Sequence, residues 1–151
     1  MAFTLRSARA DDQAVITALV RRARINPRGL QWQNFLLAED GGSIIGVGQV
    51  KPHADGVREL ASIAVIPQRQ HQGIASMIIR ALLAKETGPI YLMCIDNLAT
   101  FYMQFGFHVM APTDLPRSLA KEYRLGSRIL RIFGLVVRQR LRLMVMVREV
   151  R

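Results

Sequence analysis

Cysteine is nearly absent from this chain of 151 residues, and so are long apolar runs. The single thiol, Cys94, has no second cysteine with which to form an internal disulfide, so a reducing, cytoplasmic compartment is expected. No apolar run approaches the roughly 20 residues that a membrane-spanning helix needs. The first residues lack the basic-then-apolar layout that is typical of a secretory signal.

Acidic residues are scarce as well, with 11 Asp and Glu against 21 Lys and Arg and a net charge of +10. Residues 1–110 carry 11 basic and 8 acidic side chains, a net charge of +3, whereas residues 111–151 carry 10 and 3, a net charge of +7. Such an excess suits nucleic acid, an anionic membrane surface or an anionic ligand, but it also suits an ordinary solvated face. Charge alone therefore does not identify a partner.

Half of the residues are hydrophobic, which is enough for the core of one domain spanning residues 1–151. Apolar spacing and turn residues predict helices after Asp12, from Gly73 and after Asn97. Strands are expected near residues 3–9, 35–38, 43–50, 59–66, 90–95, 107–110 and 141–147. This order predicts a mixed α/β fold built on one central sheet.

The most informative segment joins the strand at 59–66 to the helix that begins near Gly73. A polar loop, Gln68-Arg69-Gln70-His71-Gln72, separates the strand from small residues at the start of the helix. The first amides of a helix have no partner within it, and the helix dipole places partial positive charge there. A pyrophosphate could accept hydrogen bonds from those amides, with Arg69 as a mobile cation beside it. An ordinary strand-to-helix turn is the simpler alternative.

The string Gln70-His71-Gln72-Gly73-Ile74-Ala75 resembles the signature (Arg or Gln)-x-x-Gly-x-(Gly or Ala) of the GNAT acetyltransferases. A second string, Phe101-Tyr102-Met103-Gln104-Phe105-Gly106-Phe107, resembles the family's (Leu or Phe)-Tyr-x-x-x-Gly-Phe, although Leu98 stands where the family usually has alanine. The resemblance covers residues 3–110 and the final strand. It implies a single domain with a mixed central sheet, a splayed strand pair and flanking helices.

The resemblance also implies a function: transfer of an acetyl group from acetyl-CoA to a primary amine, by direct attack within a ternary complex. Tyr102 is then the candidate general acid for the departing thiolate, and Glu59 is the candidate base. The implied cofactor contacts come from three segments, Ile63, Ala64 and Val65; Gln70, His71, Gln72, Gly73, Ile74, Ala75 and Ser76; and Asn97. Tyr102 could instead pack beside Phe101 and Phe105, and Glu59 could pair with Arg58 or Lys51.

No metal is expected, because His53, His71 and His108 show no ligand spacing among themselves or relative to Cys94. Cys94 is expected to be a core residue rather than a nucleophile.

Residues 115–139 form an insertion with the pattern of a basic amphipathic helix. Its basic residues recur at intervals of four, three, four and three, which places them on one helical face: Arg117, Lys121, Arg124, Arg128 and Arg131. We expect Leu119, Tyr123, Ile129 and Phe133 to pack on the domain or on a second subunit, so that a homodimer is left open. Attraction to an anionic membrane surface or to nucleic acid is the weaker alternative.

Two other function classes compete with the enzyme. One is a protein that binds acyl-CoA as a sensor without turnover. The other is a basic nucleic-acid-binding module, which is not expected because the chain lacks any recognised binding motif and interleaved aromatic residues.

Overall fold

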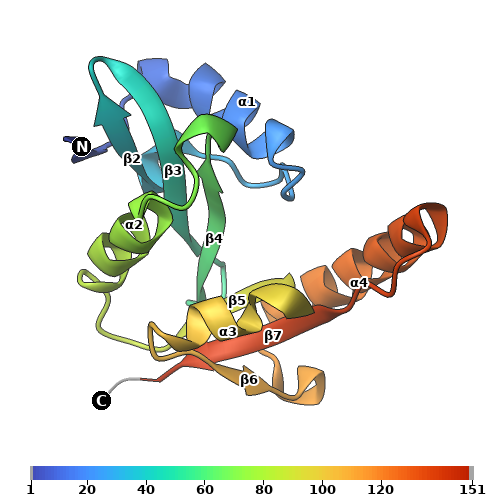
Figure 1. The fold of residues 1–151 in the computed structure, drawn as a ribbon. Coiled ribbons are helices and arrows are strands. Elements are labelled where there is room, and N and C mark those ends of the chain that lie inside the picture. Colours follow the sequence, from blue (N-terminus) through green and yellow to red (C-terminus); the bar gives the residue numbers. More distant parts are fainter. Residues whose placement is uncertain (1, 150–151) are drawn as a thin grey trace. The chain divides into compact units, whose positions relative to one another are not determined.

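The computed structural model describes residues 2–149, and their contacts divide the chain into two compact units. The first unit comprises residues up to 51 together with 60–86, and the second comprises residues 52–59 and 87 onward. Figure 1 shows the elements of both units as a ribbon.

The described residues form seven strands and four α-helices. The strands are β1 (Thr4–Ser7), β2 (Phe35–Asp40), β3 (Ser43–Pro52), β4 (Arg58–Val65), β5 (Ile90–Ile95), β6 (His108–Met110) and β7 (Leu143–Arg148). The helices are α1 (Gln13–Arg22), α2 (Ile74–Leu83), α3 (Ala99–Met103) and α4 (Arg117–Val137). Hydrogen bonding follows the order β1-β2-β3-β4-β5-β7-β6. The mixed α/β class that the sequence predicts is confirmed.

Both parallel and antiparallel pairs occur. β1 pairs antiparallel with β2, and β2 with β3, whereas β5 pairs antiparallel with β7, and β7 with β6. β4 pairs parallel with β5 at one position, where Glu59 faces Tyr91 within the second unit. Among the described residues this is the only register partner that these two strands share.

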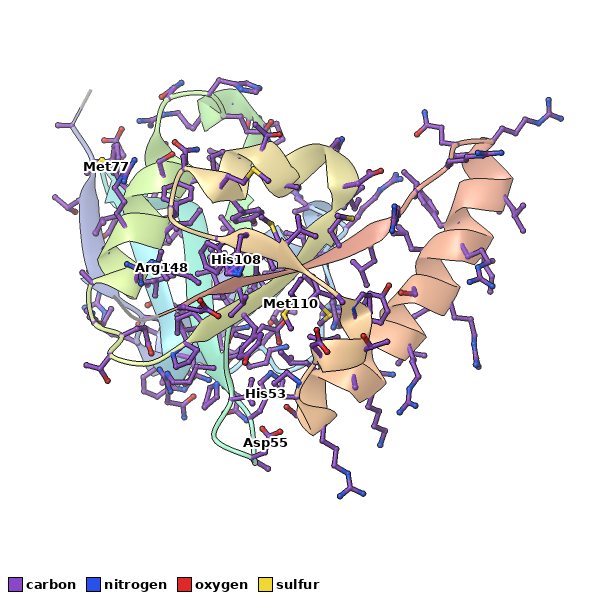
Figure 2. All side chains as sticks on the ribbon, turned by 90° about the horizontal axis from the view of Figure 1, so that it is seen from below. His53, Asp55, Met77, His108, Met110 and Arg148 are labelled. Carbon is purple, nitrogen blue, oxygen red and sulfur yellow. The ribbon has the colours of Figure 1, made fainter. Side chains whose placement is uncertain are left out.

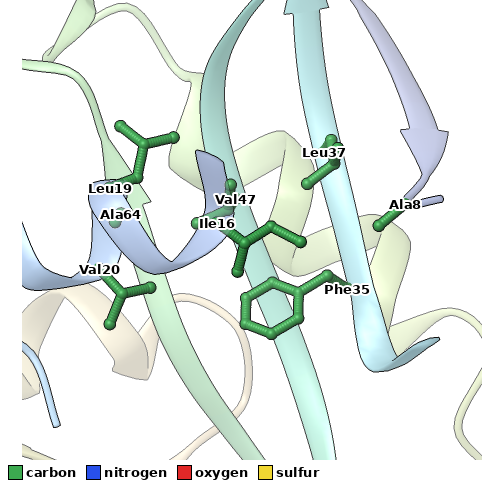
Figure 3. Packing of buried hydrophobic residues seen from close by; sticks show 8 residues of the cluster. All are labelled: Ala8, Ile16, Leu19, Val20, Phe35, Leu37, Val47 and Ala64. Atoms are coloured by element: carbon green, nitrogen blue, oxygen red, sulfur yellow. The ribbon is translucent and has the colours of Figure 1, made fainter. Parts of the chain in front are cut away.

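The core of the first unit lies between α1 and the strands. Apolar residues on one side of α1 meet the buried residues of β2 and β3 (Figure 3), and the cluster consists of Ala8, Ile16, Leu19, Val20, Phe35, Leu37, Val47 and Ala64. Val15, an apolar residue of the same helix, is exposed. The 3.6-residue period of the helix carries Ile16, Leu19 and Val20 inward and leaves Val15 at the edge.

Two glycines of β3 allow α2 to lie close against the strand. A Cβ atom added at Gly48 would lie 2.6 Å from Ile63 Cδ1 and 2.7 Å from Ile78 Cγ2, and one at Gly46 would lie 3.0 Å from Ile74 Cγ2. A side chain at either position would therefore push the helix away from the strand. α2 buries Ile74, Ile78, Ile79, Leu82 and Leu83, whereas Met77, which the sequence places on the apolar face, is exposed.

The second unit is built on β5, β7 and β6, with α3 and α4 attached. Leu92, Val145 and Met146 are almost completely buried in its strands, and Leu119 is fully buried on α4. α4 runs without interruption from Arg117 to Val137, so Gly126 and Gly134 do not break it. No helix within residues 2–149 combines the length and the apolar character needed to cross a bilayer.

Candidate functional site

The loop between β4 and α2 has the backbone geometry expected of an anion-binding turn. Gly73 lies in the left-handed region with φ 82° and stands as the N-cap of α2. The first helical hydrogen bond of α2 runs from the amide N–H of Met77 to the carbonyl oxygen of Gly73, at 3.1 Å. The amides of Ile74, Ala75 and Ser76 therefore belong to the first turn, where an external acceptor such as a phosphate can bind.

Glycine at position 73 suits the backbone conformation of the loop. A Cβ atom added there would meet nothing within 4 Å, but the positive φ is one that residues with side chains rarely adopt. His71, with φ 62°, is the other residue of this loop in the same region, and its side chain is exposed. The loop thus presents its backbone and the polar side chains of Gln70, His71 and Gln72 to solvent.

Arg69 is not the mobile cation that the sequence suggests. Its Nη1 donates to Asp40 Oδ2 over 2.7 Å, and its Nε donates to Gln72 Oε1 over 3.0 Å. The side chain is largely buried, so the guanidinium ties the loop to the end of β2. Gln70 is also engaged locally, because its Nε2 donates to Val65 O over 3.3 Å. These contacts fix the shape of the loop. The loop would therefore lose less conformational entropy when it binds an anion.

Strand β4 contains a backbone irregularity just before the residues predicted to contact the cofactor. Ser62 is buried and has φ 58°, a conformation that is strained for a serine in a strand. Gln49 Nε2 donates to Ser62 Oγ over 2.9 Å and to Gly29 O over 3.3 Å. Such a local bend redirects the backbone groups of Ile63, Ala64 and Val65. The sequence does not reveal it, because the strand pattern continues through Ser62.

In the second unit, Tyr102 lies on α3 among aromatic rings. Its ring meets that of Phe101 at a centroid distance of 5.1 Å and that of Phe107 at 6.3 Å, both edge to face. Phe105 packs on Phe101 rather than on Tyr102. Burial, with a smaller contribution from Cys94, raises the pKa of Tyr102 to about 12. The phenol therefore stays protonated across the physiological range and can donate a proton.

Within residues 2–149, no side chain or backbone group forms a hydrogen bond with the Tyr102 hydroxyl under ordinary distance and angle limits. The ring is thus positioned by packing, while the hydroxyl is not committed to a structural partner. Cys94 differs, because its side chain is buried and that burial, followed by the charge of Asp96, raises the thiol pKa to about 11. A thiol with so high a pKa is a poor nucleophile at neutral pH, in agreement with its assignment to the core.

Asn97 lies in a short 3-10 turn, Asp96–Leu98, that precedes α3. The Asn97 side chain is exposed and does not cap the helix, since α3 begins at Ala99 with Leu98 as its N-cap. Neither Asp96 nor Asn97 is the N-cap of α3, because the 3-10 turn places the start of the helix beyond both residues.

Glu59 is buried, with 5% of its surface exposed, and is held by His53. His53 Nε2 lies 2.9 Å from Glu59 Oε1, so Glu59 is not the exposed strand-end charge paired with Arg58 or Lys51 that the sequence allowed. Donor atoms of Glu59, His53 and Glu122 all lie within 4.8 Å of one another. Figure 2 shows His53 at the turn that precedes β4. These donor types also suit a transition-metal ion.

Sequence spacing could not find this cluster. Position 53 lies in the β3–β4 turn, 59 lies at the start of β4, and 122 lies on α4, so only the folded second unit brings them together. The spacing among the histidines and Cys94 also leaves out carboxylates, and here two of the three donor residues are glutamates.

A family model described as an acetyltransferase (GNAT) domain matches residues 31–109. No curated relative matches the sequence. Among solved structures, N-acetylglutamate synthase from Neisseria gonorrhoeae with coenzyme A and N-acetyl-glutamate is 21% identical with a TM-score of 0.78, covering 100% of this chain and 36% of that one.

Two further structures are similar over nearly their whole length. Rv2747 from Mycobacterium tuberculosis, in complex with CoA, is 22% identical with a TM-score of 0.72, covering 98% of this chain and 99% of that one. The ribosomal-protein-S18-alanine N-acetyltransferase of Escherichia coli is 16% identical with a TM-score of 0.67, covering 99% and 94%. The present chain spans only about a third of the gonococcal synthase. At these identities the structures establish a shared fold.

Proposed function

Because the chain belongs to the GNAT acetyltransferase family, we propose that it is an N-acetyltransferase that uses acetyl-CoA and a primary amine. The observation that carries this proposal is the β4–α2 loop, where a left-handed Gly73 leads into the free amides of Ile74, Ala75 and Ser76. Backbone donors at a helix N-terminus match the pyrophosphate of coenzyme A in charge and in hydrogen-bonding capacity. The pantetheine arm would follow Ile63, Ala64 and Val65 of β4, and Asn97 would add a further contact.

In this proposal the amine attacks the thioester carbonyl directly within a ternary complex. The new C–N bond forms as the C–S bond breaks, the amine loses a proton and the departing thiolate gains one. Tyr102 would supply the proton to sulfur, since its phenol is neutral at physiological pH and its hydroxyl has no structural partner within the described residues. A freely available acid favours turnover over the alternative of an acyl-CoA sensor without catalysis.

Glu59 would accept the proton of the amine, directly or through water, with His53 beside it. A buried carboxylate paired with an imidazole has a fixed orientation and a second site to which a proton can move. Acetyl transfer also requires positioning of the amine, which a rigid pair supports better than a solvated side chain.

The direct test is a screen of amine acceptors for release of free thiol from acetyl-CoA by the whole chain. The names of two structural neighbours point to α-amino acceptors, glutamate in one and an alanine of a ribosomal protein in the other. Free amino acids and peptides with different N-terminal residues are therefore the first set to test. Acetyl-CoA binding without thiol release for any acceptor would favour the sensor.

Replacement of Glu59 by Gln is expected to reduce the rate about tenfold or more at low pH, where the amine is protonated, and much less at high pH. The measurement is a pH–rate profile of kcat/KM on the acceptor found in the screen. Glu122→Gln is the matched control, because it removes a carboxylate of the same cluster that has no proposed role. Equal pH profiles for Glu59→Gln and the wild type would assign the base to water alone.

A further inference from the structure

Helix α4 is anchored on the second unit by its first half. Leu119 is fully buried, and the Asp55 carboxylate accepts hydrogen bonds from Ser118 Oγ at 3.0 Å and from Ser118 N–H at 3.2 Å. Gly126 lies so close to β7 that an added Cβ atom would be 3.2 Å from Leu143 Cδ2. Figure 2 shows Asp55 at the turn beside the start of this helix. These contacts hold the first half of α4 against the second unit.

The second half of α4 exposes apolar side chains instead of packing them. Phe133 is 41% exposed and Ile129 is 58% exposed. Of the two alternatives expected for these residues, packing on the domain is therefore wrong, and packing on a second subunit stays a prediction. The exposed apolar set comprises Leu125, Ile129, Ile132, Phe133, Leu135, Val136 and Val137. Burial of this many large apolar side chains on a partner would be strongly favourable, whereas their exposure to water is costly.

A basic face runs beside the apolar one. At 100° per residue, Arg117, Lys121, Arg124, Arg128 and Arg131 fall within a sector of about 80°, and Leu125, Ile129, Ile132, Phe133 and Val136 fill the adjoining sector. Across residues 2–149, no salt bridge involves any of these five cations. Residues 117–142 contain eight Lys and Arg and a single acidic residue, Glu122. The face therefore lacks counter-charges of its own.

At the C-terminal end of α4 the chain folds back and forms a cavity of about 430 Å³. The turn is tight, because a Cβ atom at Gly134 would lie 2.7 Å from Gln139 O, and Arg138 adopts φ 55° to close it. The cavity is lined by Arg131, Gly134, Leu135, Arg138, Gln139, Arg140 and Leu141. Three of the lining residues, Arg131, Arg138 and Arg140, are cationic, and exposed apolar side chains lie on the same end of α4. Cationic and apolar residues in one place suit a phosphate that is attached to an apolar body.

We infer that the exposed side of α4 binds the surface of a bilayer that contains anionic phospholipids, with a headgroup phosphate in the cavity at the end of the helix. The apolar sector would enter the boundary between headgroups and acyl chains, and the adjoining cations would remain at the level of the phosphates. The helix lies in the plane of the surface, because it carries too many charges to span the bilayer.

A nucleic acid or a second copy of the chain would match only one of the two sectors of α4. A nucleic acid would neutralise the cations but would leave the apolar sector in water. A second copy of the chain would cover the apolar sector but would bring two strongly basic helices together, and like charges at an interface oppose association. An anionic bilayer satisfies both sectors at once.

The test is co-sedimentation of the whole chain with vesicles, using phosphatidylcholine alone or with about one third phosphatidylserine. We expect binding to the anionic vesicles only, weakened about tenfold or more when salt rises from about 0.1 M to about 0.5 M. The combined change Arg124→Glu, Arg128→Glu and Arg131→Glu should abolish binding, and Ile129→Ser with Ile132→Ser should weaken it about tenfold or more. All of these side chains are exposed, so the variants should fold.

The matched control reverses three exposed arginines of the first unit, Arg21, Arg22 and Arg24, which lowers the net charge by the same amount. It should keep most of the vesicle binding. Equal loss in the control would reduce the effect to net charge and overturn the inference. So would equal binding to neutral vesicles, a salt-insensitive dimer that Ile129→Ser abolishes, or preferential binding of RNA. Acetyl-CoA affinity, measured on the same samples, reports separately on the proposed function.

Discussion

Replacement of Gly73 by Glu is expected to abolish acetyl-CoA binding while leaving the chain folded. The wild type should bind the cofactor with a Kd on the micromolar scale, about −8 kcal/mol, and the variant should lose at least about 100-fold. The added carboxylate would stand at the N-cap of α2, where it blocks the free amides and repels the pyrophosphate. Calorimetric titration with acetyl-CoA measures the change directly.

Strain must be separated from charge in this experiment. Gly73 has φ 82°, so any side chain there should cost about 1–2 kcal/mol of stability, although an added Cβ meets nothing within 4 Å. Gly56→Glu is the matched control, since Gly56 has φ 83° and equally open surroundings in the β3–β4 turn. The control should lose similar stability and keep its affinity. Unchanged affinity in a folded Gly73→Glu variant would move the phosphate site elsewhere.

Removal of the Tyr102 hydroxyl is expected to lower kcat about 100-fold or more without changing acetyl-CoA affinity. Phe at this position keeps the edge-to-face contacts with Phe101 and Phe107, so the melting temperature should stay close to that of the wild type. Steady-state kinetics on the acceptor from the screen, together with calorimetry for the cofactor, separates the two effects. Tyr123→Phe makes the same chemical change on α4 and should leave kcat unaltered.

The pH dependence gives an independent check on Tyr102. Because burial raises its pKa to about 12, the phenol is protonated, and therefore active as an acid, at all lower pH values. Its deprotonation should reduce the rate only as the pH approaches that value. A loss of rate with an apparent pKa several units lower, retained in Tyr102→Phe, would belong to another group. Wild-type turnover in Tyr102→Phe would show that the thiolate leaves without this acid.

The order of elements and the position of the loop before α2 could be predicted from local sequence. Helical spacing and turn residues predicted the bounds of α1, α2, β2, β3 and β5 to within a few residues. They could do so because the hydrophobic period and chain-breaking residues act over short distances. The need for glycine at position 73 agrees with its positive φ, whereas its part in binding the cofactor stays a prediction. The family resemblance at residues 70–75 and 101–107 falls within the segment that the family model matches.

Long-range pairings could not be predicted in this way. Arg69 looks like a free cation in the sequence, yet β2 places Asp40 within 2.7 Å of it. Glu59 looks like a strand-end charge, yet the turn at His53 and helix α4 surround it with an imidazole and a second carboxylate. The strained Ser62 depends on Gln49 of the neighbouring strand. In each case the partner lies on another element, and a one-dimensional pattern contains no information about which elements meet.

Some properties of helix α4 follow from the sequence, and others follow only from the tertiary structure. Its length, its basic stripe and its apolar positions are properties of the sequence, because a period of 3.6 residues assigns each side chain to a face. Which of those faces is covered depended on the tertiary structure. Contacts with Asp55 and Leu143 hold the first half of the helix in place. Ile129, Ile132 and Phe133 stay exposed, because no described strand or helix covers them. Amphipathic spacing selects the faces of a helix, whereas only the packed neighbours decide which face remains available to a partner.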